Sequence, residues 1–117
     1  MVKQYQDLVV WQKAMAVVTE VYKTTAAFPD NEKFGLTSQM RRAAVSIPSN
    51  IAEGQGRMSS GEFKQFLGHA RGSLYELETQ LLICENMELI ESQLAEQLQQ
   101  QTKEVGRLLN GLLRSLN

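Results

Sequence analysis

The stretch RRAAVSIPSNIAEGQGR, residues 41–57, decides the fold because it keeps a helical pattern across a proline. Ala44, Ile47 and Ile51 stay three or four positions apart on both sides of Pro48, which is typical of one face of a helix. A proline inside a helix removes one backbone hydrogen bond and costs ~3 kcal/mol. Since a broken helix has little reason to keep this phase, we expect one helix kinked at Pro48 rather than two helices meeting at a turn. The side chains available to bond the freed carbonyl are Ser46, Ser49 and Asn50.

Four helical patterns cover the chain, at about residues 8–28, 36–55, 60–86 and 92–116. We expect Asp7 to cap the first helix and Pro29 to end it. Ser59 and Glu62 have the spacing of a capping box at the start of the third. The connections are short and no strand-like alternation competes, so neighbouring helices should run antiparallel. The sequence therefore predicts an all-α fold, an antiparallel up-down four-helix bundle with residues 1–117 in a single domain.

Each pattern has an apolar stripe that we assign to the core. The stripe of the first is Leu8, Trp11, Met15, Val18 and Tyr22. That of the second is Leu36, Met40, Ala44, Ile47 and Ile51. The third is the most regular, with Phe63, Leu67, Ala70, Leu74, Leu77, Leu81 and Cys84, and the fourth has Leu94, Leu98, Val105, Leu108, Leu112 and Leu116.

The composition is that of an ordinary globular protein, with 43% hydrophobic and 21% charged residues. The net charge of -1 gives no overall electrostatic case for nucleic acid or membrane. We see no signal peptide and no apolar run near the ~20 residues that a membrane span needs. A single cysteine cannot form an internal disulfide, and this suits the cytoplasmic location that we expect. The charge is nevertheless uneven: residues 37–75 carry +3 and residues 76–104 carry -6.

Two helices have a second side of low polarity, opposite the expected core stripe. On the third helix that side contains glycines in mid-helix, each of which costs ~1 kcal/mol relative to alanine unless something compensates. Close approach of another helix is the usual reason for such glycines. We therefore expect self-association through the second and third helices, with the first helix as a further candidate and the polar fourth helix outside; the alternative is a scatter of small surface residues. The candidate interface residues are Val45, Ser49, Ala52, Gly68, Gly72, Tyr75 and Thr79.

The sequence offers little catalytic or metal-binding chemistry. His69 is the only histidine, so a di-iron or zinc site lacks ligands. Cys84 continues a core stripe and is interpreted as a small buried hydrophobe. The segment GQGRMSSGEFK, residues 54–64, lacks the ending of a phosphate-binding loop. We expect no enzyme, no metal and no cofactor.

Basic residues in the middle of the chain offer a nucleic-acid hypothesis. A symmetric oligomer repeats each of them in a ring, so a modest patch per chain becomes a concentrated field. Phosphate contacts of this kind are independent of sequence and weaken steeply with salt. The alternative is that Arg41 and Arg42 pair with Glu53, Glu62 or the acidic third helix of a neighbouring copy. The candidate residues are Arg41, Arg42, Arg57, Lys64 and Arg71.

The segments FGLTSQMRRAAVSIPSNIAEGQGR and EFKQFLGHARGSLYELETQL carry a resemblance to a known family. They resemble the 23S ribosomal RNA intervening-sequence proteins of bacteria, over roughly residues 5–116. The resemblance implies a four-helix bundle that assembles as a homopentamer, with no catalytic residues to transfer. A more distant relative, the accessory variability protein of retroelements, is a basic pentameric bundle that binds nucleic acid.

Two functions follow as expectations. The first is a non-enzymatic, homo-oligomeric bundle, pentameric by resemblance, that acts as an interaction scaffold of unknown cellular role. The second is an accessory protein that binds RNA or DNA through a ring of basic residues. The expected partners are other copies of the chain and, in the second case, nucleic acid, but no membrane.

Overall fold

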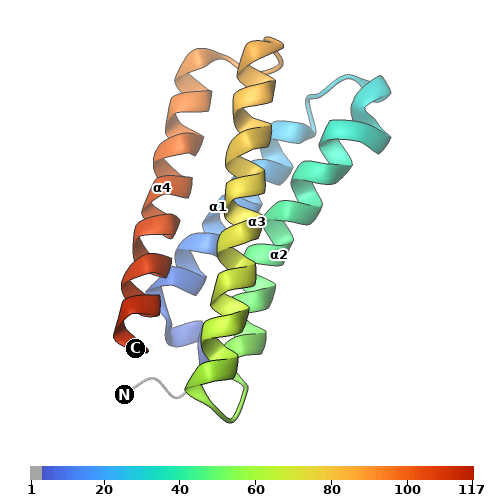
Figure 1. Ribbon diagram of the computed structural model, residues 1–117. Helices are drawn as coiled ribbons and strands as arrows, with labels where there is room; N and C mark the ends of the chain where they lie inside the picture. The colour runs from blue at the N-terminus through green and yellow to red at the C-terminus, as the bar shows by residue number, and fades with distance from the viewer. Residues whose placement is uncertain (1–3) are drawn as a thin grey trace.

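A computed structural model describes residues 4–117, and in this range it contains four α-helices and no strand. The helices are α1 (Val9–Thr25), α2 (Ser38–Gln55), α3 (Ser60–Asn86) and α4 (Ser92–Ser115). In Figure 1, α1 and α3 lead away from the end of the bundle that holds the two termini, and α2 and α4 lead back. The prediction of an all-α bundle is confirmed, and the helix bounds differ from the expected ones by at most three residues.

The segment between α1 and α2 is folded into two short turns. A 3₁₀ turn spans Asp30–Glu32 and a π-helical turn spans Lys33–Thr37. Glu32 stabilises the second turn, because its carboxylate accepts a hydrogen bond from the Leu36 amide at 3.4 Å. Gly35 lies inside this turn with non-helical angles, φ -105° and ψ -110°, so the chain changes direction there before α2 begins.

The core is built mainly from the stripes of α2 and α3. Met40, Ala44, Ile47 and Ile51 are fully buried, as predicted. All of the α3 stripe is buried except the half-buried Phe63. In α4 the buried set is Ala95, Leu98, Thr102, Val105 and Leu109, so it is rotated relative to the predicted stripe.

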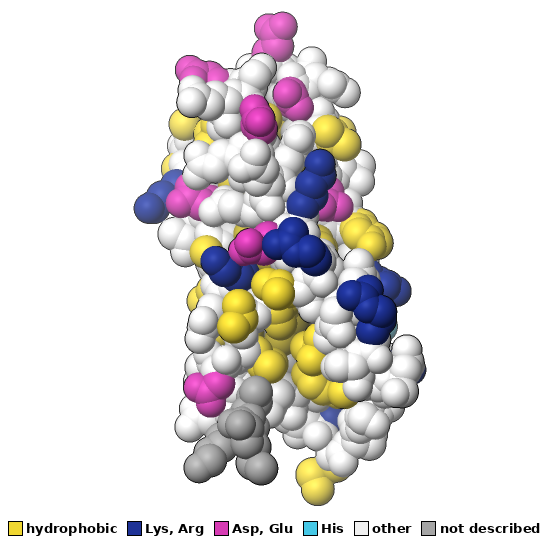
Figure 2. Space-filling model, turned by 90° about the vertical axis from the view of Figure 1, so that its left-hand side faces the viewer, with side chains coloured by type: hydrophobic (Ala, Val, Ile, Leu, Met, Phe, Trp, Pro, Cys, Tyr) yellow, Lys and Arg dark blue, Asp and Glu magenta, His cyan; other side chains and the backbone are white. Residues whose placement is uncertain are grey.

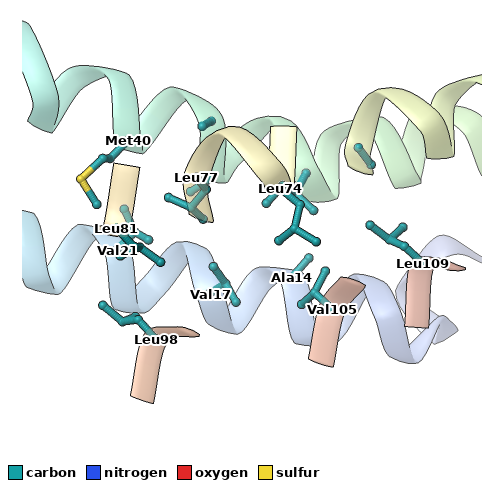
Figure 3. Close-up of a cluster of buried hydrophobic side chains, with 14 of the residues drawn as sticks. Ala14, Val17, Val21, Met40, Leu74, Leu77, Leu81, Leu98, Val105 and Leu109 are labelled. Atoms are coloured by element: carbon teal, nitrogen blue, oxygen red, sulfur yellow. The ribbon is translucent and has the colours of Figure 1, made fainter. Parts of the chain in front are cut away.

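The predicted core stripe of α1 is wrong. The buried residues of this helix are Val10, Ala14, Val17, Val21 and Thr25. Figure 3 shows Ala14, Val17 and Val21 among the leucines and valines of α3 and α4. Thr25 tolerates burial because its hydroxyl donates to the Val21 carbonyl at 2.7 Å. The larger residues that we assigned to the core lie to one side: Met15 is 40% exposed and Tyr22 is 42% exposed.

Helix α2 continues through Pro48, which is buried. The expected satisfaction of the freed carbonyl is wrong: within residues 4–117 no side-chain hydrogen bond reaches the Ala44 carbonyl. Asn50 instead donates to the Ser46 carbonyl at 2.8 Å and to the Ser46 hydroxyl at 2.9 Å. The Ser46 hydroxyl in turn bonds Ser73 of α3 at 2.8 Å. These polar side chains therefore tie α2 to α3, and the kink itself stays a prediction.

The helix starts are only partly as expected. Ser59 caps α3, since its hydroxyl accepts from the Glu62 amide at 3.2 Å. Asp7 does not cap α1. It belongs to the 3₁₀ turn Tyr5–Asp7, and its carboxylate accepts a hydrogen bond from the backbone N–H of Gln4 at 3.3 Å. The residue before α1 is Leu8, which has no side-chain cap to offer.

Candidate interaction surfaces

An apolar groove runs between α1 and α2 on the outside of the bundle. It is lined by Tyr5, Trp11, Met15, Val18, Val45, Pro48, Ser49 and Ala52. Met15 and Val45 are each 40% exposed, and Trp11 is half-buried with the Tyr5 ring edge-on at 5.3 Å. The groove contains three of the predicted interface residues from α2 together with the α1 side chains that we had assigned to the core.

The other predicted interface residues lie along the outer side of α3. A Cβ added to Gly68 or Gly72 would meet no heavy atom within 4 Å, so no close approach within residues 4–117 explains either glycine. Tyr75 is 50% exposed, and Thr79 donates its hydroxyl to the Tyr75 carbonyl at 2.8 Å. Leu82 and Ile83 extend the exposed apolar side chains of this helix, at 52% and 40%. We call the side formed by Gly68, Gly72, Tyr75, Thr79 and Ile83 the α3 ridge.

The structure separates the apolar groove from the α3 ridge. Between α2 and α3 lies a polar depression lined by Gln39, Arg42, Ala43, Ser46, Ser73 and Glu76. The predicted α2 residues line the apolar groove, whereas the predicted α3 residues line neither the groove nor this depression. The interface predicted from the sequence is therefore two surfaces on one chain.

The five predicted basic residues lie in three separate places. Arg41 is fixed against α1: it donates to the Thr25 hydroxyl at 2.9 Å and to the Tyr22 carbonyl at 3.3 Å. Arg57 lies over the Phe66 ring and pairs with Glu53 at 3.3 Å. Arg42 lies beside Arg41, and both line one depression. Arg71 and Lys64 lie in the groove between α3 and α4, where Arg71 bonds the Asn110 side chain and Lys64 bonds the Asn117 side chain. Among the described residues neither Arg41 nor Arg42 forms the expected ion pair with Glu53 or Glu62; Glu53 pairs with Arg57 instead.

A basic depression lies where α1 ends and α2 begins, and we call it the basic hollow. It is lined by Tyr22, Lys33, Phe34, Thr37, Ser38, Arg41, Arg42, Val45 and Ser46. Sequence reasoning found its two arginines but missed Lys33 and Phe34, because the connection between the helices has no periodicity. It also assigned Tyr22 to the core, although this residue lies under Arg41, whose guanidinium carbon is 4.5 Å from the ring centroid.

The side of the molecule on which α4 lies has mixed charge. Figure 2 shows acidic side chains at the top of this side, basic and acidic side chains together across its middle, and hydrophobic side chains gathered below them. Lys13 of α1 pairs with Glu104 of α4 at 3.2 Å, and Arg107 approaches the same carboxylate at 3.5 Å. Because these charges compensate one another, this side has no uniform field to attract a charged ligand.

The side chains that could act as nucleophiles or metal ligands do not form a site within residues 4–117. His69 is exposed and meets the Phe66 ring edge-on at 5.9 Å. Burial, with a smaller contribution from the charge of Glu32, raises the pKa of the Cys84 thiol to about 11. Within residues 4–117 no group of three or more His, Cys, Asp or Glu side chains is placed to hold a metal ion. None of the described helices is both long enough and apolar enough to cross a membrane.

Comparisons with known proteins agree with this architecture. The model of the family described as 23S rRNA-intervening sequence protein matches residues 6–111. A crystal structure of a protein of unknown function, from the S23 ribosomal protein family of Bacteroides thetaiotaomicron VPI-5482, superposes with a TM-score of 0.81. That protein is 24% identical in sequence, and the match covers 90% of this chain and 98% of the other. No curated protein matches the chain.

Proposed function

The chain belongs to the 23S rRNA-intervening sequence protein family, and we propose that it is a non-enzymatic scaffold that works as a homo-oligomer. The proposed contact places the α3 ridge of one copy in the apolar groove of the next. The resemblance to the family implies that the assembly has five copies of the chain.

The exposed apolar groove is the observation that carries this proposal. A four-helix bundle needs one apolar stripe per helix, and α1 already contributes its Val10–Thr25 stripe to the core. Met15 and Val45 nevertheless stay 40% exposed over the neighbouring groove. Covering apolar surface is worth about 25 cal/mol per Å², so a copy that fills the groove gains free energy at each contact.

Two features of the α3 ridge favour a contact with another helix. Gly68 and Gly72 leave the helix backbone open, which allows another helix to approach closely. Tyr75 and Ile83 project from the same side and are 50% and 40% exposed. Aromatic anchors of this kind are enriched at the centres of protein interfaces.

Two unlike surfaces on one chain favour a ring over a two-fold dimer. A two-fold contact joins the same patch on both copies, whereas a contact between different patches runs head to tail and closes into a ring if the rotation permits. The separation of the groove from the ridge therefore supports a cyclic assembly.

Light scattering on the purified protein tests the proposal. The wild type should have a mass several times the 13.2 kDa of one chain. Val45→Glu places a carboxylate in the groove, where burial of an unpaired charge costs several kcal/mol, and should weaken the assembly at least about 100-fold.

The matched control is Val9→Glu, the same change on the same bundle. Val9 is 54% exposed and does not line the groove, so this variant should keep the mass of the wild type. A wild type that scatters as a single chain at all concentrations contradicts the proposal. If the Val45→Glu variant assembles as well as Val9→Glu, the contact between copies does not lie in the groove.

A further inference from the structure

We propose that the basic hollow binds a nucleotide unit of a single-stranded nucleic acid. The hollow measures about 650 Å³, within the ~300–1,000 Å³ typical of ligand sites. It brings Lys33 and Phe34 of the connecting segment against the first turns of α2 and the end of α1. The site is thus different from the ring of five basic residues that the sequence alone favours.

All the charged side chains that line the hollow are positive. Lys33, Arg41 and Arg42 line it, and none of the lining side chains is acidic. Glu32 is the acidic residue next to it in sequence, and its carboxylate is turned to the Leu36 amide. An anion that enters the hollow therefore meets cations and no competing carboxylate.

The two arginines have different places in the site. Arg41 is held by two hydrogen bonds and by the Tyr22 ring, so its position is fixed. Arg42 is exposed and forms no hydrogen bond or ion pair within residues 4–117. Its guanidinium is free to form the paired hydrogen bonds that phosphate oxygens accept.

Phe34 adds an exposed aromatic ring, which a site for a simple anion does not need. Its ring is 90% exposed, and the Lys33 ammonium lies 5.6 Å from the ring centroid. Stacking of a base on an aromatic side chain is worth ~1–3 kcal/mol and depends little on which base it is. A base on Phe34 with its phosphate at Arg42 uses both features, whereas an acidic peptide would use the cations alone.

The hollow does not depend on the proposed assembly. It adjoins the apolar groove and shares Val45 with it, but all the other groove residues lie outside the hollow. One chain holds a complete hollow. In a ring each copy presents one, so that a single strand can contact several at once and gain avidity.

Fluorescence anisotropy with a labelled single-stranded oligouridine tests the proposal on the full chain. Phe34→Ala should weaken RNA binding about 5-fold or more, the equivalent of ~1 kcal/mol, and leave inorganic polyphosphate binding unchanged. Arg42→Ala should weaken the binding of both and flatten the salt dependence, because each phosphate contact on a single strand contributes ~0.7 to the slope.

Matched controls keep the result specific. Met58→Ala removes another nearly fully exposed apolar side chain, and Arg107→Ala removes an exposed cation outside the hollow; both should bind RNA as the wild type does. Light scattering on each variant reports assembly separately, so that a failure of the oligomer is not read as a failure of the nucleotide site.

Three results would overturn the proposal. The first is no RNA binding at about 50 mM salt. The second is a Phe34→Ala variant that binds RNA like Met58→Ala, which would reduce the hollow to an anion site. The third is competition by free uridine monophosphate at concentrations equal to the RNA, which would assign the hollow to a free nucleotide instead of a strand.

Discussion

The same substitution at two glycines should have opposite effects on stability. A Cβ at Gly54 of α2 would lie 2.6 Å from the Phe66 Cβ of α3, well inside the ~3.5–4.0 Å of normal carbon contacts. Neither atom is at the end of a flexible side chain, so the two helices must shift. At Gly111 of α4 the nearest atom outside the helix backbone would be the Arg114 guanidinium at 3.8 Å, an ordinary contact.

These distances set the expected magnitudes. Overpacking of this kind costs ~1–3 kcal/mol, and the gain in helix propensity, at most ~1 kcal/mol, offsets only part of it near the end of α2. Gly54→Ala should therefore lower the free energy of unfolding by about 1 kcal/mol. Gly111→Ala should raise it by ~0.5–1 kcal/mol, because the helix loses the entropic cost of glycine without a clash.

Urea unfolding followed by circular dichroism measures both variants. They must be compared at one protein concentration, because an assembly makes apparent stability depend on concentration. A Gly54→Ala variant as stable as Gly111→Ala would refute the close contact between α2 and α3 at this point. An unchanged slope with denaturant in both would show that the substitutions change stability and not the surface exposed on unfolding.

Three further predictions concern other parts of the molecule. Gly72→Leu should leave folding intact and reduce the mass seen by light scattering, because the side chain has open space in the chain but would occupy the proposed contact; an unchanged mass counts against the ridge. Cys84 should resist a thiol reagent at neutral pH and react fully in denaturant, and rapid labelling of the native protein would contradict its burial. Because its pKa is raised from 9.0 to about 11, the free energy of unfolding should be unchanged below pH 9 and fall as the pH rises toward 11. Ser73→Ala should cost ~1 kcal/mol of unfolding free energy, since it removes the partner of Ser46 between α2 and α3, and no measurable loss would show that this bond contributes nothing.

The sequence predicted α3 well because that helix has one regular apolar stripe. From Leu67 to Cys84 the residues of this stripe recur without interruption, and all of them are buried. The regular pattern leaves a single way to rotate the helix against the core. The same reasoning placed Met40, Ile47 and Ile51 of α2 correctly.

In α1 the same reasoning failed because two apolar stripes overlap. Trp11, Met15 and Tyr22 are larger than Ala14 and Val17, so size favoured the wrong face. The bundle buries the smaller residues, whereas Trp11 and Met15 line the apolar groove and Tyr22 lines the basic hollow. Hydrophobic period alone does not decide between two such faces, since both satisfy it.

The candidate site could be predicted only in part for a similar reason. Arg41 and Arg42 were recognisable as charges on a helix, and their neighbours come from elsewhere in the chain. Phe34 reaches the hollow through the turns between α1 and α2, which follow no periodic pattern. The partition of Val45 and Gly72 onto separate surfaces likewise depends on how α2 and α3 are rotated in the bundle.

The accessibility of Trp11 tests the central claim most directly. This is the single tryptophan of the chain, and it lies in the apolar groove that another copy is proposed to cover. Acrylamide quenching of its fluorescence, measured through a dilution series alongside the mass, should be weak in the assembled protein and rise at the concentration where the mass falls. Quenching that is strong at every concentration, in a protein that scatters light as one chain, would contradict the account.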